Sequence, residues 1–192
     1  MTREPATLII LAGGESKRMG FPKYQLTLDG RDVLTHLNGR LGHLFVETIV
    51  VGRDLDFAPE DVRIAEDRFI ARSPLVGIHG GLSASRTDLT FVIACDMPYV
   101  EPALVSFLLD RADNVDVVVP VVRGYYEPLC AVYRTSCVRS IERLIERGTL
   151  KVSELYPLVD ERRVDEEQAR LHDPLLRSFA NLNVPAEIKE AA

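Results

Sequence analysis

The sequence predicts an α/β fold, a three-layer αβα sandwich in which helices cover both faces of a mostly parallel sheet. Short apolar runs of strand length alternate along the chain with segments whose apolar residues recur at helical spacing. This alternation is typical of βαβ units. The first apolar run, Thr7–Leu11, is branched and lacks polar alternation, as expected of a parallel strand buried on both faces.

The length and composition indicate one globular domain, residues 1–192. No apolar run approaches the roughly 20 residues that a membrane helix requires, and the N-terminal residues do not form a convincing secretory signal. We therefore expect a cytoplasmic protein that does not enter a membrane. Cys95, Cys130 and Cys137 are odd in number and widely spaced, which favours reduced core residues over disulfides or a zinc site.

The formal net charge of −6 argues against a nucleic-acid partner, because such binding needs a basic field over a large surface. An anionic small molecule remains compatible with this charge. It requires only a local group of positive side chains, and the acidic surplus is concentrated elsewhere, for example at residues 160–167.

The elements can be assigned in chain order. After the first strand, further strands are expected at 47–52, 62–65, 89–95, 115–120, 126–133 and 162–164. Helices are expected at 33–45, 74–82, 101–112, 137–147 and 152–156, with a last one entered through Pro185. Asp32 and Ser73 are the expected N-caps of the first two helices. A Gly-Tyr turn can reverse the strand at 126–133 into an antiparallel edge.

The segment Leu11–Lys23 is a glycine-rich, basic loop that follows the first strand. Gly13 and Gly14 lack the Cβ that would keep phosphates away from the backbone amides, and Arg18 and Lys23 add positive charge. This combination suits a polyphosphate ligand. The loop has neither the Gly-Lys-Ser/Thr ending of the common phosphate loop nor the G-x-G-x-x-G spacing of dinucleotide-binding folds. The alternative is a flexible surface turn with solvated basic side chains.

Two acidic residues follow predicted strands. Asp96 comes directly after the strand at 89–95, and the nearby Pro98 stops further strand pairing. Ligands of open parallel sheets bind at the carboxyl ends of the strands, so Asp96 is a candidate Mg²⁺ ligand beside a triphosphate. It could instead cap the next helix or turn. Asp67 follows the strand at 62–65. The alternative to a ligand-binding role is that its carboxylate is merely solvated.

The loop as a whole resembles a family signature. Leu-Ala-Gly-Gly-x-Ser-x-Arg-Met-Gly, followed by Lys23, is similar to the motif of the molybdenum cofactor guanylyltransferases, which are nucleotidyltransferases. Ser73–Gly77 resembles the family segment Gly-Pro-Leu-x-Gly, except that Ser73 replaces the first glycine. Other matching segments are Cys95–Pro98, Glu127–Leu129 and Asn181–Asn183.

The resemblance implies a Rossmann-like fold of the nucleotide-diphospho-sugar transferase type. It implies transfer of GMP from GTP to the molybdopterin (molybdenum) cofactor, giving molybdopterin guanine dinucleotide and pyrophosphate. Lys23, with Arg18, would neutralise phosphate charge, and Asp96 would hold Mg²⁺, the implied cofactor. The residues implied to bind the nucleotide are Leu11, Ala12, Gly13, Gly14, Lys23, Asp67 and Asp96.

Two other functions are compatible with these residues. A related enzyme could use CTP, as in molybdenum cofactor cytidylyltransferases, or another phosphorylated acceptor; cytidylyl-transferring relatives tend to carry Leu-Ala-Ala-Gly in place of Leu-Ala-Gly-Gly. A catalytically silent adaptor that delivers the cofactor is the second alternative, and retention of Lys23 and Asp96 argues against it. The expected partners are GTP and the molybdopterin cofactor, with molybdoenzyme apoproteins or cofactor-delivery proteins as further candidates.

Overall fold

The computed structural model contains an eight-stranded sheet and a separate two-stranded one. The residues that it describes are 5–13, 24, 26–28, 30–53, 55 and 57–182. The strands of the large sheet are β1 (Ala6–Leu11), β4 (Glu47–Val51), β5 (Arg63–Ala65), β6 (Leu89–Ala94), β7 (Val117–Val122), β8 (Tyr125–Tyr126), β9 (Cys130–Arg134) and β10 (Glu161–Asp165). The small sheet pairs β2 (Thr27–Leu28) with β3 (Arg31–Asp32).

The helices fall between these strands. The α-helices are α1 (Val33–Leu41), α2 (Pro74–Ala84), α3 (Pro102–Leu109), α4 (Val138–Glu146) and α5 (Glu166–Arg170). Short 3-10 segments are η2 (Gly42–Leu44), η3 (Thr135–Cys137), η4 (Val152–Glu154), η5 (Tyr156–Leu158) and η6 (Arg177–Phe179). Among the described residues, no helix is both long and apolar enough to cross a membrane.

The order of the large sheet is β10-β7-β9-β6-β1-β4-β5, with β8 beside β7. Strands β6, β1, β4 and β5 run parallel to one another, and β10 runs parallel to β7. Strand β9 runs antiparallel to both β6 and β7. The predicted reversal is therefore confirmed, but the predicted edge position is wrong. Residues Cys130–Tyr133 of β9 are buried, and this apolar run suits a strand inside the sheet.

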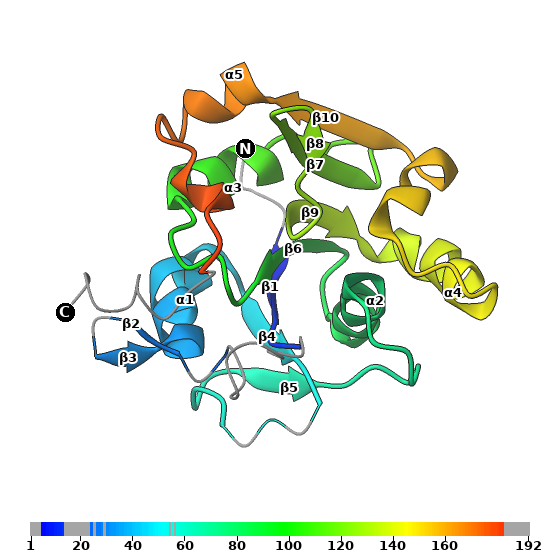
Figure 1. Cartoon of the computed structure of the whole chain (residues 1–192), viewed down its shortest axis with the longest axis horizontal. Coiled ribbons are helices and arrows are strands. Elements are labelled where there is room, and N and C mark those ends of the chain that lie inside the picture. The colour runs from blue at the N-terminus through cyan, green and yellow to red at the C-terminus, as the bar shows by residue number, and fades with distance from the viewer. Residues whose placement is uncertain are drawn as a thin grey trace.

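Helices cover both faces of the sheet, which confirms the predicted three-layer fold (Figure 1). Side chains of β1 alternate between two hydrophobic cores. Leu8 and Ile10 share one core with apolar residues of α1 and α3. Ile9 and Leu11 point to the other face, where they share a core with residues of α2 and α4.

Both predicted N-caps are confirmed. The Asp32 carboxylate accepts a hydrogen bond of 2.8 Å from the Thr35 amide, and the Ser73 hydroxyl accepts one of 3.3 Å from the Val76 amide. Pro74 occupies the first turn of α2, where its missing N–H costs no helical hydrogen bond. These caps fix where α1 and α2 begin, immediately before they cover the sheet.

A few elements differ from the prediction. The segment expected as a short helix at 152–156 forms η4 and η5, and the strand expected at 126–133 is divided between β8 and β9. Helix α5 was not predicted, although Asp165 and Gln168 form a capping box at its start. The helix expected after Pro185 lies outside the described residues.

Candidate active site

The four neighbouring parallel strands β6, β1, β4 and β5 finish at the same end of the large sheet. We call this end, where their carboxyl ends lie, the carboxyl edge. In the registers of β1 with β6 and β4, Leu11 pairs with Ala94 and Val51, and in the next register Val51 pairs with Ala65. The pairing continues one residue further, because the Cys95 amide donates to Leu11 O at 3.0 Å. Loops that leave these strands therefore start side by side.

Gly13 and Asp96 lie in two of these loops. Each stands two residues beyond its strand, Gly13 after β1 and Asp96 after β6, so the structure brings these two predicted site residues to neighbouring positions. Gly13 is exposed, and no atom of the described residues lies within 4 Å of a Cβ built on it. The described part of the chain therefore leaves the space next to the Gly13 Cα unfilled.

The backbone around Asp96 is held in a defined turn. The Met97 amide donates to Ala94 O at 3.1 Å, and the Asp96 carbonyl accepts from the Leu182 amide at 2.8 Å. Leu182 is buried, and Asn181 precedes it. This contact brings the Asn181 segment, which is distant in sequence, to the same edge of the sheet as Asp96. The Asp96 residue itself is half-buried.

Asp67 also stands two residues beyond its strand, after β5. Its side chain is 4% exposed. One carboxylate oxygen accepts from the Phe69 amide at 2.6 Å, and the other lies 2.6 Å from Nδ1 of His79. The protein thus supplies partners for both oxygens, and the expected nucleotide contact of Asp67 remains a prediction.

Several predicted site residues lie outside the described part of the chain: Gly14, Arg18, Lys23 and Asn183. Their assignments stay predictions. Leu11 and Ala12 are described and buried, and the Ala12 amide donates to Val51 O at 2.8 Å. The Ala12 amide is therefore committed to the sheet.

Two further residues at this edge had not been assigned a role from the sequence. Arg53 leaves β4 and donates to the carbonyls of Phe69 and Ile70, the latter at 2.9 Å. Glu127 precedes β9, and burial raises its carboxyl pKa while the nearby Arg123 partly opposes that rise. Leu129 O accepts from the Ala94 amide at 3.1 Å, which puts the Glu127 segment beside the end of β6. The one sequence signal for Glu127 was that Glu127–Leu129 resembles a segment of the family.

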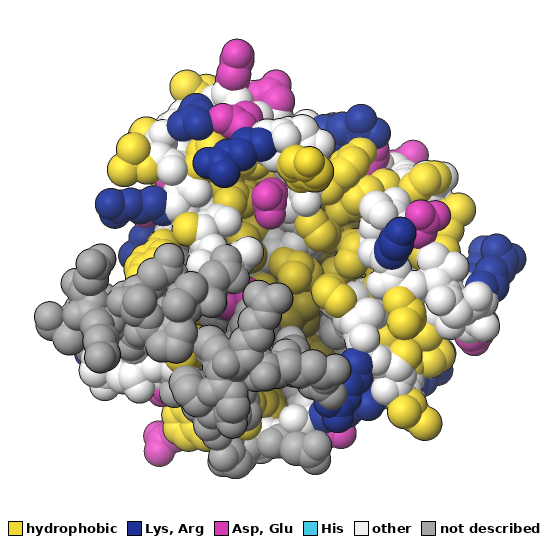
Figure 2. Space-filling model, viewed as in Figure 1, with side chains coloured by type: hydrophobic (Ala, Val, Ile, Leu, Met, Phe, Trp, Pro, Cys, Tyr) yellow, Lys and Arg dark blue, Asp and Glu magenta, His cyan; other side chains and the backbone are white. Residues whose placement is uncertain are grey.

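The face of the molecule in Figure 2 is hollowed near its centre, in front of the central strands labelled in Figure 1. Hydrophobic side chains lie along the right side of the hollow, an acidic side chain lies at its upper rim, and Lys and Arg side chains lie farther out. Ligands of open α/β sheets bind in a crevice outside the carboxyl ends of the strands.

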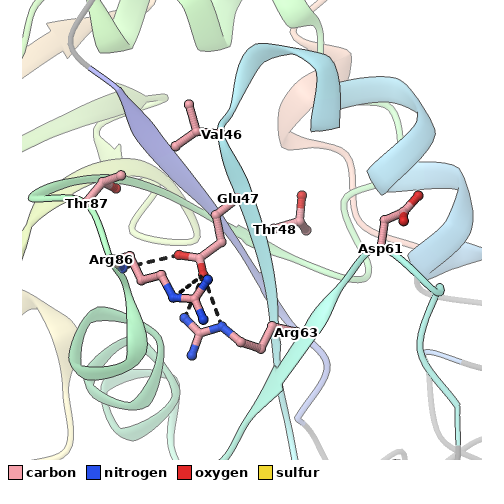
Figure 3. A pocket seen from close by; sticks show the side chains of 7 residues that line it. All are labelled: Val46, Glu47, Thr48, Asp61, Arg63, Arg86 and Thr87. Carbon is pink, nitrogen blue, oxygen red and sulfur yellow. Dashed lines mark hydrogen bonds and ion pairs between the residues drawn. The ribbon is translucent and has the colours of Figure 1, made fainter.

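A different pocket, of about 300 Å³, lies at the opposite edge, where β4 and β5 begin (Figure 3). Glu47 lies at its centre and accepts hydrogen bonds of 3.0 and 2.7 Å from Arg63. The charge of Glu47 is thus paired within the protein, and none of the predicted site residues lines the pocket. This pocket is therefore distinct from the candidate active site.

Comparison with known proteins gives the family. The family described as the MobA-like NTP transferase domain matches residues 8–163, which is most of the chain, from within β1 to within β10. The chain belongs to this family. The matched range includes Gly13, Asp67 and Asp96.

Relatives with assigned names agree with this membership. The chain is 35% identical over 191 residues to the molybdenum cofactor guanylyltransferase of Desulfosudis oleivorans, covering 98% of this chain and 95% of the relative. It is 34% identical over 187 residues to the probable molybdenum cofactor guanylyltransferase of Pelotomaculum thermopropionicum, covering 97% and 91%.

Solved structures support the fold. Molybdopterin-guanine dinucleotide biosynthesis protein A from Archaeoglobus fulgidus has a TM-score of 0.82 and 26% identity, with 96% of each chain covered. The 2-C-methyl-D-erythritol 4-phosphate cytidylyltransferase from Thermus thermophilus has a TM-score of 0.71 and 17% identity, covering 99% of this chain and 97% of that one. The second likeness concerns the fold alone.

Proposed function

We propose that this chain transfers GMP from GTP to the molybdopterin form of the molybdenum cofactor, producing molybdopterin guanine dinucleotide and pyrophosphate. The observation that carries the proposal is the near full-length similarity to molybdenum cofactor guanylyltransferases, at 35% identity for the Desulfosudis oleivorans protein. The neighbouring positions of Gly13 and Asp96 supply a physical basis, because a phosphate-binding backbone and a carboxylate then share one edge of the sheet.

The reaction can proceed without a nucleophile from the protein. A terminal phosphate oxygen of the acceptor attacks the α-phosphorus of GTP, a new P–O bond forms, and the bond to the bridging oxygen breaks as pyrophosphate leaves with the electron pair. The chain has to align the two phosphates and neutralise their charge. In our proposal the loop from Leu11 to Gly14 holds the nucleotide, Asp67 contributes to that binding, and Lys23 with Arg18 faces the phosphates.

Asp96 would hold Mg²⁺. The fit rests on the donors: Asp96 is a half-buried carboxylate, and Mg²⁺ commonly takes one or two carboxylates together with phosphate oxygens and water. Within the described residues, no group of three or more His, Cys, Asp or Glu side chains could enclose a metal ion. When bound, Mg²⁺ neutralises phosphate charge during transfer.

The proposed partners are GTP and the molybdopterin cofactor, followed by a protein that receives or carries the product. We also place the chain in the cytoplasm. Cys95, Cys130 and Cys137 form no disulfide with one another and are buried, and burial raises the pKa of Cys137 to about 12. Reduced, buried thiols of this kind suit a reducing compartment.

Pyrophosphate release from GTP, ATP and CTP, with molybdopterin present, tests the proposal. We expect GTP to be used in preference to CTP at equal concentrations. Release only with CTP would overturn the guanylyl assignment while leaving the nucleotidyltransferase family intact. No release with any nucleotide would favour the adaptor alternative.

Gly13→Ala tests the part of this preference that comes from space beside the loop. The described residues leave the space beside Gly13 unfilled, and in our proposal the purine lies there, so a methyl group would occupy part of its space. Shape differences of this size discriminate by roughly 10- to 200-fold, so we expect the variant to narrow the GTP preference or to lose activity. Competition between GTP and CTP in the variant measures it, and an unchanged preference would remove Gly13 from base selection.

A further inference from the structure

His79 is a buried histidine that faces carboxylates with both ring nitrogens. It lies in α2, and its side chain is 3% exposed. Nδ1 is 2.6 Å from Oδ2 of Asp67, and Nε2 is 3.2 Å from Oε1 of Glu142 in α4. The Ser83 hydroxyl also lies 3.4 Å from Nε2. The shortest of these contacts is the one to Asp67.

The contact to Asp67 anchors a loop that borders the candidate active site. We call residues 66–72, which connect β5 to α2, the Asp67 loop. Asp67 also accepts from the Phe69 amide inside this loop, and the Phe69 ring meets the His79 ring edge-on at 5.1 Å. His79 therefore holds the loop by a hydrogen bond and by an aromatic contact.

Helix α2 approaches the loop so closely that Gly80, next to His79, has no space for a side chain. A Cβ at Gly80 would lie 3.2 Å from both Cβ and Oδ2 of Asp67. Such contacts are tighter than most real Cβ contacts, so this glycine lets Asp67 sit against the helix. The Asp67 carboxylate is thus aimed at α2 by backbone packing as well as by His79.

We infer that His79 is a positioning residue for nucleotide binding: it orients Asp67 and thereby sets the shape of the Asp67 loop at the carboxyl edge of β5. His79 does not itself touch the substrate. The inference rests on the proposed function in so far as the ligand is GTP. It goes beyond the site residues expected from the sequence, because His79 is not among them.

Two substitutions separate the two sides of the ring. In His79→Asn the side-chain amide nitrogen can replace Nδ1 and still donate to Asp67, whereas the contact with Glu142 is lost. In His79→Leu both ring nitrogens are lost, with little change in side-chain volume. We expect the Kd for GTP to rise about tenfold or more in His79→Leu, because a hydrogen bond to a charged group contributes about that factor. In His79→Asn, which keeps this hydrogen bond, we expect the Kd to stay within about threefold of the wild-type value.

Glu142→Gln serves as the matched control, because it removes the charge that faces Nε2 and leaves the Asp67 contact in place. Its amide oxygen can still accept the hydrogen bond that Arg68 of the Asp67 loop donates to Glu142. We expect its GTP affinity to be unchanged. Isothermal titration calorimetry with GTP and Mg²⁺ gives the Kd without requiring turnover, and thermal unfolding shows whether each variant is folded. A merely structural role would lower the melting temperatures but leave the Kd of the folded variants unchanged.

The outcomes distinguish the two proposals. Equal GTP affinity in wild type and folded His79→Leu would overturn the positioning role, as would a His79→Asn variant no better than His79→Leu. If His79→Leu does not fold, the comparison of His79→Asn with Glu142→Gln decides, because weaker GTP binding in His79→Asn alone contradicts the inference. Tight GTP binding by the wild type without transfer to molybdopterin would overturn the proposed function and leave the positioning role standing.

Discussion

A single carboxylate, Asp96, follows a strand that is buried along its whole length. Its backbone is held by hydrogen bonds with neighbouring segments, including that from Leu182. These contacts involve main-chain atoms, so they survive a change of the side chain. The position of Asp96 can therefore be separated from its charge by mutation.

Asp96→Asn should abolish Mg²⁺-dependent transfer while leaving the fold intact. The change removes a charge and almost no volume, and the loss of one preorganised electrostatic group commonly lowers turnover by about 100-fold or more. Pyrophosphate release and thermal unfolding check the two halves of the expectation. Asp113→Asn, the same change at an exposed residue, is the control. A folded Asp96→Asn protein with full turnover would exclude Asp96 from the metal site.

Lys23→Ala should weaken the use of GTP strongly, by roughly 100-fold in kcat/KM, whereas Lys189→Ala should have little effect. Lys23 belongs to the glycine-rich loop and Lys189 to the C-terminal segment. A cation that faces phosphates in a partly desolvated site interacts more strongly than a solvated surface lysine. Steady-state kinetics with varied GTP measures both variants, and similar effects in the two would mean that Lys23 is a surface residue.

At the scale of elements, helix α2 has an unusual glycine content because it packs closely against its surroundings. A Cβ on Gly81 would lie 2.5 Å from Cγ2 of Ile9, a fully buried residue of β1, and a Cβ on Gly77 would lie 3.3 Å from Cδ2 of Leu11. The intrinsic cost of glycine in a helix is thus offset by the close approach of α2 to the sheet.

Gly81→Ala and Gly39→Ala should change stability in opposite directions. We expect Gly81→Ala to lower the free energy of unfolding by about 1–3 kcal/mol, because the added methyl group overpacks the core. Gly39 lies in α1, and no atom of the described residues is within 4 Å of the position that a Cβ would take there. Alanine at Gly39 should raise the free energy of unfolding by up to about 1 kcal/mol. Urea unfolding measures both, and a stabilising Gly81→Ala would contradict the close packing.

At the scale of the whole molecule, Glu47 connects several elements at the edge opposite the candidate site (Figure 3). Its carboxylate accepts from Arg63 of β5, from the Arg86 amide and from the Thr7 hydroxyl of β1. Burial opposes ionisation of Glu47, but the hydrogen bonds from Arg86 and Arg63 outweigh it. The pKa of Glu47 therefore lies below its ordinary value of 4.5.

The lowered pKa makes part of the stability depend on pH. The ionised carboxylate stabilises the folded state fully above about pH 4.5, the value in the unfolded chain, and this contribution is lost as the pH falls through the lower folded-state pKa. Glu47→Gln should therefore lower the free energy of unfolding at pH 7 by about 1–3 kcal/mol and flatten its decline below pH 4.5. Urea unfolding between pH 3 and 7 tests this, and parallel pH profiles would contradict it.

Local patterns in the chain were enough to establish the fold class and the main candidate residues. Buried parallel strands such as β1 and β6 are continuous apolar runs, and the N-caps Asp32 and Ser73 act on their own helices, so short stretches of sequence predict them. Gly13 and Asp96 could be chosen for the same reason, because each follows its strand directly in the chain.

Tertiary packing, in contrast, decides which distant segments meet. The interior position of β9 depends on pairing with both β6 and β7, and the contact between Leu182 and Asp96 joins residues that no local pattern relates. His79 was inconspicuous in the sequence because its partners, Asp67 and Glu142, belong to other elements. Hydrogen bonds between side chains depend on positions in space, which become defined only when α2 and α4 have packed on the sheet.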